Sequence, residues 1–265
     1  MQSSIYRYHL LLPALMLLMG LANAQTGSPT LAALETTYSD AAVGDVPLLA
    51  PKSWATATAD YKQALIAAAE DPLSEGSVAA ANSALNAIAA AQTNADQVRP
   101  LLANLLQKRS LAEAANSASL APKPWNAAEK QLVKLTSDIE RGKLSAQVAR
   151  QQRSGRVFAL YDEAELEALT NALLARPREA RALALVGKAN KLASITFNSG
   201  DDALQASSDA LQQQRYDNAT AAALANAAEQ RFAHATQLTL VAQQLKSKQL
   251  TTEQLLLLWE SRLLQ

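Results

Sequence analysis

APKPWNAAEKQLVKLTSDIE, residues 121–140, has the spacing of an amphipathic α-helix. Pro124 suits a first helical turn, where its missing N–H costs nothing. The apolar residues after it recur at three- and four-residue steps and fall on one stripe: Trp125, Ala128, Leu132, Leu135 and Ile139. Gly142 can adopt positive φ and so end the helix. The stretch predicts a helix that buries one side.

The start of this stretch belongs to an internal repeat. APKSW at residues 50–54 returns as APKPW at 121–125, so that Trp54 and Trp125 are 71 residues apart. Phe197, in ASITF, follows 72 residues later. Each aromatic residue precedes about 17 residues of helical pattern, a break and a longer helical stretch. The repeat predicts three related three-helix units, at 50–120, 121–192 and 193–265.

Composition extends the helical prediction to the whole chain. The sequence is rich in Ala, Leu, Gln and Glu and lacks the alternating β-branched runs of strands. Ala-rich seams with short connections favour antiparallel neighbours. We therefore expect an all-α protein, an elongated antiparallel helical bundle.

Two long helices carry finer predictions. In the middle unit we expect a helix over about 145–175, ended or kinked at Pro177, and another over about 178–193. In the last unit a seven-residue rhythm predicts a coiled-coil-like seam that could mediate self-association. That seam consists of Ala221, Leu224, Ala228, Ala235, Leu238, Ala242 and Leu245.

The first 24 residues have the order of a secretory signal peptide. Arg7 precedes an apolar run of 12 residues, Leu10 to Leu21, and Ala22 and Ala24 supply the small residues before a cleavage point. We expect a cleaved signal at 1–24, a periplasmic location and a short helix with a linker at 25–49; an uncleaved anchor is the alternative. The chain contains no Cys, which excludes disulfides and lipidation at a cleavage-site cysteine. No later segment has the length of a transmembrane helix.

Residues 122–172 resemble a helical envelope domain of unknown function. The likeness rests on Trp125, Leu132 and Gly142 and on the segments Asp138–Glu140 and Tyr161–Leu166, and Arg215-Tyr216-Asp217 is similar to a downstream part of that region. In that family the domain lies between a signal sequence and an OmpA-like peptidoglycan-binding domain. We expect the present chain to lack the OmpA-like domain. The resemblance implies a periplasmic role in envelope organisation, with no peptidoglycan binding and no catalytic residues to transfer.

Residues with catalytic chemistry are few. His234 is the single histidine after the signal, and no Gly-rich phosphate-binding loop occurs. Glu163 and Glu167 share a helix face, and two carboxylates can act on a glycan, although a solvated face explains them as well. We expect no metal site, no cofactor and no enzymatic activity.

Charge is distributed unevenly along the chain. The 24 Lys and Arg balance the 24 Asp and Glu, but residues 123–191 carry 13 of the former and 8 of the latter. Two arginine groups lie in this segment: Arg150, Arg153 and Arg156, then Arg176, Arg178 and Arg181. They predict a docking face for an envelope protein, an anionic lipid or a glycan, and the overall balance argues against nucleic acid. Internal pairing with acidic neighbours is the alternative.

These observations favour a non-enzymatic periplasmic scaffold or interaction protein. A second reading is a small-molecule or lipid carrier with a pocket between helices. Its lining would include Trp54, Trp125, Phe197 and Tyr161. A third and more remote reading is an envelope glycan hydrolase acting through His234 and the acidic run, which consists of Asp162, Glu163, Glu165 and Glu167. The alternative for the whole run is a solvated helix face.

Overall fold

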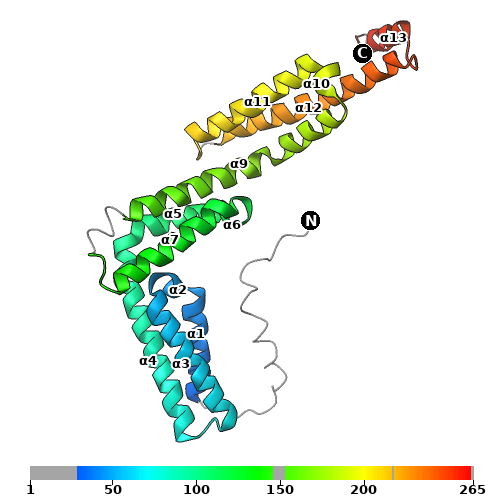
Figure 1. Cartoon of the computed structure of the whole chain (residues 1–265). Helices are drawn as coiled ribbons and strands as arrows, with labels where there is room; N and C mark the ends of the chain where they lie inside the picture. The colour runs from blue at the N-terminus through cyan, green and yellow to red at the C-terminus, as the bar shows by residue number, and fades with distance from the viewer. Residues whose placement is uncertain (1–28, 146–152, 217, 264–265) are drawn as a thin grey trace. The chain divides into compact units, whose positions relative to one another are not determined.

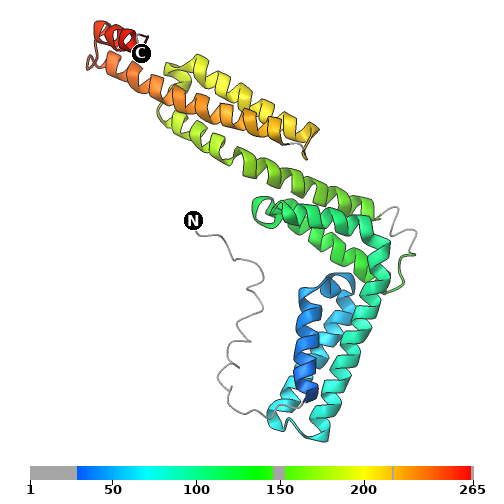
Figure 2. The ribbon, with the colours of Figure 1, turned by 180° about the vertical axis from the view of Figure 1, so that it is seen from behind.

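The protein is helical throughout the part of the chain that the structure describes. The computed structural model describes residues 29–145, 153–216 and 218–263, and no strand occurs among them. Figures 1 and 2 show long helices packed side by side, which confirms the predicted all-α class. The predicted signal peptide, residues 1–24, lies outside the described residues.

The described residues form two compact units. Unit 1 contains residues up to Leu101 together with 136–145, and unit 2 contains 102–135 and the described residues that follow. Unit 1 includes α1 (Pro29–Val43), α2 (Val46–Leu49), α3 (Pro51–Glu70) and α4 (Glu75–Val98), followed by the 3-10 helix η2 (Arg99–Leu102). Unit 2 includes α5 (Ala103–Ala114), α6 (Ser117–Leu120), α9 (Ser154–Val186), α10 (Ala189–Leu192), α11 (Ser194–Gln213), α12 (Ala219–Lys246) and α13 (Thr252–Leu263). Helix α7 (Pro122–Glu140) begins in unit 2, and its last turn and a half belongs to unit 1.

Unit 1 is a three-helix bundle with a core of small side chains. Helices α3 and α4 pack along each other, and α1 packs against α4. The buried positions of α3 and α4 are mostly alanine, with Ile88 as the largest, and α1 adds Leu34. Alanine lets the helix axes approach closely but buries little area for each residue.

Helix α3 is capped from a distant part of the chain. Its N-cap residue, Ala50, offers no side-chain acceptor. Glu140 instead accepts hydrogen bonds from the backbone N–H groups of Lys52 at 2.9 Å and Ser53 at 2.7 Å. The Ser53 hydroxyl also donates to Glu140 and itself accepts from Asn94. A carboxylate at this end of a helix also interacts favourably with the helix dipole.

Unit 2 contains two bundles that share α9. The first part of α9 packs on α5 and α7, where Tyr161 meets Trp125 edge-to-face at 5.6 Å. The later part packs on α11 and α12, and Ala184 joins the core formed by Phe197, Phe232 and their neighbours. In both views of the chain α9 runs past both groups of helices (Figures 1 and 2).

The 71- to 72-residue period is present in the backbone. The four-residue helices α2, α6 and α10 are each followed by an alanine with nearly the same conformation, and a long helix then begins. These alanines are Ala50 (φ −131°, ψ 58°), Ala121 (φ −138°, ψ 56°) and Ala193 (φ −136°, ψ 45°). The aromatic residue four positions later donates its N–H to the alanine carbonyl in each copy. The three segments therefore fold by one local plan.

A side-chain contact repeats with the same period. In each copy the residue 16 positions before the aromatic residue lies over its ring and hydrogen-bonds to the residue four positions after it. Arg109 covers Trp125 and pairs with Glu129, and Arg181 covers Phe197 and pairs with Asp201. In the first copy Tyr38 stacks on Trp54 at 4.9 Å and donates to Thr58 at 3.4 Å.

The helices group differently from the predicted units. The segment predicted as a short helix and linker, 25–49, supplies α1 and α2 to the first bundle. The predicted boundary near 175 is wrong, because α9 continues through Pro177 to Val186. Pro177 and Leu174 are both buried, so packing on this part of α9 outweighs the helix-breaking cost of about 3 kcal/mol. Each bundle thus takes its first helix from the segment that precedes its aromatic residue.

Candidate functional site

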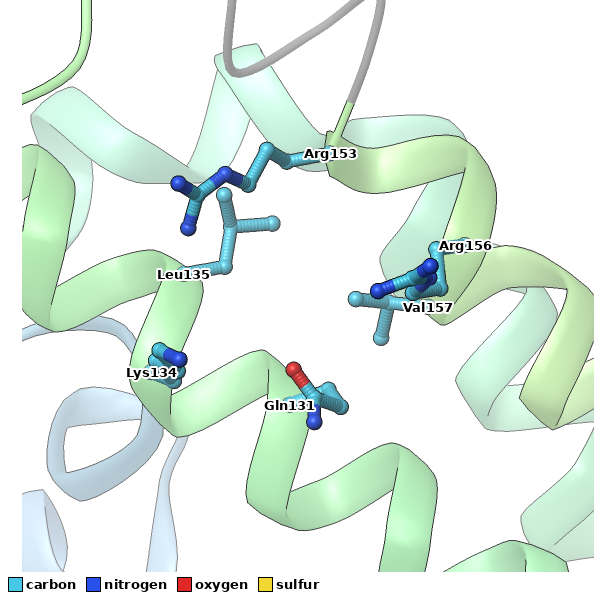
Figure 3. Close-up of a pocket in the computed structure, with 6 residues that line it drawn as sticks. All are labelled: Gln131, Lys134, Leu135, Arg153, Arg156 and Val157. Atoms are coloured by element: carbon cyan, nitrogen blue, oxygen red, sulfur yellow. The ribbon is translucent and has the colours of Figure 1, made fainter.

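A hollow lined by cationic side chains lies between α7 and the start of α9. Its volume is about 460 Å³, and it is bordered by Gln131, Lys134, Leu135, Arg153, Arg156 and Val157. Figure 3 shows Gln131 and Lys134 on α7 facing the side chains of α9, with Arg153 extending toward Leu135. Three of the six lining residues are cationic and none is acidic. We call this site the basic hollow.

Helical spacing explains the arrangement of the hollow. Lys134 and Leu135 lie one turn after Gln131, as Arg156 and Val157 lie one turn after Arg153, so each helix presents three neighbours. Leu135 and Val157 are buried and form an apolar base. The side chains of Lys134, Arg153 and Arg156 are exposed at the rim. Long cationic side chains of this kind keep their charged ends in water while their stems cover apolar surface.

The corresponding positions in the next bundle carry uncharged and mostly small residues. The ring pair Phe197–Phe232 matches the pair Trp125–Tyr161, which aligns α11 with α7 and α12 with α9. By this alignment the six lining residues correspond to Ala203, Ala206, Ser207, Leu224, Ala227 and Ala228. Ala203, Ser207 and Ala228 are buried, and the Ser207 hydroxyl donates to the Ala221 carbonyl at 2.7 Å. The basic hollow therefore has charged residues at three positions that are Ala206, Leu224 and Ala227 in the neighbouring copy.

The structure separates the two predicted arginine groups. Arg153 and Arg156 line the basic hollow, and Arg150 lies outside the described residues. Arg176, Arg178 and Arg181 follow about 20 residues later on α9, which corresponds to about 30 Å along a helix. The five arginines that the structure describes thus do not form a single face.

The second group makes internal contacts. Arg176 pairs with Glu229 at 2.8 Å, and Arg178 donates to the side-chain oxygen of Asn171 at 2.8 Å. Arg181 pairs with Asp201 and lies over Phe197. For Arg176 and Arg181 the structure corresponds to the alternative of pairing with acidic neighbours, whereas Arg178 bonds the neutral side chain of Asn171. Of the predicted arginines that the structure describes, Arg153 and Arg156 border the basic hollow.

A buried charge network lies elsewhere in unit 2 and was not anticipated. Glu165 is 2% exposed and Lys108 is 5% exposed, and the two form an ion pair. Lys108 also meets Asp162 at 2.5 Å, while Arg215 contacts Asp162 at 2.8 Å and Glu165 at 3.1 Å. The Tyr216 hydroxyl lies 3.4 Å from both Lys108 and Glu165. The network joins α5, α9 and the turn after α11.

Mutual contacts perturb the ionisation of these groups. Burial alone would raise the pKa of Asp162, but hydrogen bonds from Lys108 and Arg215 outweigh it and lower that pKa below its usual value. Burial would lower the pKa of Lys108, but Asp162 and Glu165 outweigh it and raise that pKa. These contacts therefore favour the charged forms of Lys108 and Asp162.

The acidic run was only partly interpreted correctly. Glu163 and Glu167 are exposed, as expected of a solvated face. Asp162 and Glu165 point to the other side of α9 and belong to the buried network, which corrects the interpretation of the whole run as a solvated surface. Helical spacing would have separated the two pairs, but nothing in the sequence shows that Lys108 and Arg215 lie opposite.

The aromatic residues that were proposed to line a pocket pack against other rings, and His234 lies at the surface. Trp125, Tyr161 and Phe197 are buried and pack on aromatic partners, and Trp54 stacks on Tyr38. The Tyr161 hydroxyl donates a hydrogen bond to the Glu129 carboxylate at 2.5 Å. Burial, the negative charge of Glu129 and this hydrogen bond raise the pKa of Tyr161 well above its usual value. His234 is exposed on α12.

Among residues 29–145, 153–216 and 218–263, no group of three or more His, Cys, Asp or Glu side chains could hold a metal ion. No helix in the same ranges has the length and apolarity needed to cross a membrane.

Comparison with known proteins gives no relative. No family model matches the chain, and no curated protein or solved structure matches it either. The resemblance to the OmpA-associated helical domain therefore stays a prediction. The structure defines an all-α protein of repeated three-helix bundles with one basic hollow among the sites described above.

Proposed function

We propose that the chain is an exported, non-enzymatic helical protein of the bacterial envelope that binds an anionic partner at the basic hollow. The observation that carries this proposal is the lining of the hollow, where the cationic side chains of Lys134, Arg153 and Arg156 come together from two helices. Three cations from two helices would favour phosphate or carboxylate groups through charge-assisted hydrogen bonds. The signal-like N-terminal segment supports export.

Comparison of the repeats supports a specialised role for this site. The bundle formed by α9, α11 and α12 has Ala, Ser and Leu at the equivalent positions, which is sufficient for packing. Cationic residues at these positions bury less apolar surface than the uncharged residues of the neighbouring copy do. A binding role accounts for that substitution, whereas a purely structural role does not require it.

Partner capture in living cells tests the proposal. A photoreactive amino acid at Gln131, on the wall of the hollow, should crosslink to an envelope component. The double substitution Lys134→Gln/Arg156→Gln should weaken capture about a hundredfold or more, because each of the two charge-assisted contacts contributes about 1.5–3 kcal/mol and about 1.4 kcal/mol is tenfold. Higher salt should weaken capture in the wild type too, because exposed charges are screened.

A matched variant controls for net charge. Lys130 and Arg178 are exposed on the same two helices but do not line the hollow. The double substitution Lys130→Gln/Arg178→Gln removes the same charges from α7 and α9 and should leave capture unchanged. Equal capture by both double variants and the wild type would refute binding at the hollow.

A further inference from the structure

Apolar side chains gather at the end of unit 2 that contains α13. Helix α13 exposes Leu256, Leu257 and Trp259, the last to 63%. The turn between α9 and α11 lies near the same end, since Gln243 of α12 donates to the Gly187 carbonyl at 3.2 Å. That turn exposes Val186 and Ile195, the latter to 87%. Figures 1 and 2 both show α13 beyond α10 at the end of α12.

Helix α13 needs a packing partner. It has 12 residues, and isolated helices of that length are only marginally stable in water. None of its side chains for which burial is described is buried, and only Leu255 is half-buried. Its capping box is complete: Thr251 accepts from the Gln254 N–H at 3.2 Å, and Gln254 accepts from the Thr251 N–H at 2.9 Å. The caps fix where the helix begins but bury no apolar surface.

The other bundles in the described part of the chain contain a third helix that the α12–α13 pair lacks. The antiparallel pair α3 and α4 packs with α1, and the pair α11 and α12 packs with α9. The last pair, α12 and α13, has no third helix among the described residues. Two such pairs related by a two-fold axis would supply each other with helices, as in a four-helix bundle.

Charge at this end is self-complementary. Glu253 and Glu260 are exposed on α13, seven residues apart and therefore on one side of the helix. Four exposed lysines lie on the adjoining turns: Lys188, Lys191, Lys246 and Lys248. A two-fold contact can bring the glutamates of one copy to the lysines of the other. Helices that lie on membranes carry Lys and Arg on the polar face, and α13 carries acids there.

From these observations we infer that the α12–α13 end is the contact surface between two copies of this chain. We call it the terminal apolar surface, formed by Leu183, Val186, Ile195, Leu256, Leu257 and Trp259. The inference is independent of the proposed function, because the basic hollow is built from other residues. It also moves self-association from the predicted seam on α12 to α13, since Ala221, Ala228 and Ala235 of that seam are buried within the bundle.

Sedimentation of the purified chain over a range of concentrations tests the inference. The wild type should show a monomer–dimer equilibrium, and Leu256→Ser/Trp259→Ser should raise the dissociation constant about tenfold or more, because buried aromatic residues dominate such contacts. Leu73→Ser, at an equally exposed leucine in unit 1, should leave the equilibrium unchanged. Circular dichroism should show that both variants keep the helical fold of the single chain.

Mixing two variants tests the charge arrangement. A copy with Glu253→Lys/Glu260→Lys and a copy with Lys188→Glu/Lys191→Glu should each self-associate weakly, yet pair with each other when mixed. A wild type that stays monomeric at about 100 µM would overturn the inference. So would dimers that survive in Leu256→Ser/Trp259→Ser. Monomers that co-sediment with phosphatidylglycerol vesicles would assign the surface to lipid instead.

Discussion

At the scale of single residues, Gly200 shows how closely α11 and α12 approach. A Cβ atom at Gly200 would lie 2.7 Å from the Phe232 ring, which is itself fully buried against Phe197. The equivalent positions in the other copies, Ala57 and Ala128, are buried alanines. The Phe232 ring of the third core is therefore accommodated by the smallest residue.

We expect Gly200→Ala to destabilise the protein. Alanine favours a helix by about 1 kcal/mol over glycine, but overpacking a core costs about 1–3 kcal/mol. The net loss should be about 1 kcal/mol in urea unfolding. Gly155→Ala is the control, because nothing lies within 4 Å of its added Cβ, and it should stabilise the protein. If Gly200→Ala stabilised the protein as well, the Phe232 ring would have moved aside without a cost in free energy.

The charge network gives a second residue-scale prediction. Glu165→Met leaves the buried Lys108 ammonium without its closest acceptor, so the free energy of unfolding should fall by about 3 kcal/mol. Lys108→Met/Glu165→Met should recover most of this loss, because apolar side chains can replace a buried pair, and Arg215 keeps Asp162 as a partner. A double-mutant cycle from chemical denaturation measures the coupling, and additive losses would contradict it.

At the scale of the helix, the cap on α3 comes from Glu140 and not from the residues next to it. Glu140→Ala removes acceptors from two backbone N–H groups and should destabilise unit 1 by about 1 kcal/mol. Glu140→Gln keeps an acceptor but removes the charge, so its loss should be smaller. Hydrogen exchange of the first turn of α3 would follow both variants. Unchanged protection in Glu140→Ala would show that the cap is not needed.

Sequence patterns predicted local features of the helices better than their partners. Thr251 and Gln254 have the sequence spacing of a capping box, and the structure forms it, because both of its groups lie within four residues. The seam predicted on α12 included Leu224 and Leu238, whereas the buried stripe runs through Phe232 and Thr239. Spacing alone could not choose between these neighbouring stripes, because Phe197 and Gly200 on α11 decide which one packs.

At the scale of the whole molecule, acid should weaken unit 2. The folded pKa of Asp162 lies below its unfolded value of about 3.9. Its contribution is therefore present above about pH 4 and is lost as pH falls through the folded pKa. Urea unfolding at neutral pH and at about pH 3 should show this loss. In Asp162→Asn the loss should be smaller; an equal loss would assign acid sensitivity to other carboxylates.

The basic hollow shows how far the sequence could predict the site. The step of three residues identified Arg153 and Arg156 as neighbours, and α9 bears this out. Gln131 and Lys134 were missed, because their approach to α9 depends on how α7 packs. Trp125 and Tyr161 determine that packing, and they are 36 residues apart. Prediction of the hollow therefore required the fold and not only the pattern.

Helix α9 has a consequence for how unit 2 loses its structure. Its first turns complete the core around Trp125, and its last turns complete the core around Phe197. Neither core can open fully while the other core holds α9 in place. Thermal fluctuations should therefore expose the middle of α9 to solvent only when both cores melt together, as one cooperative block.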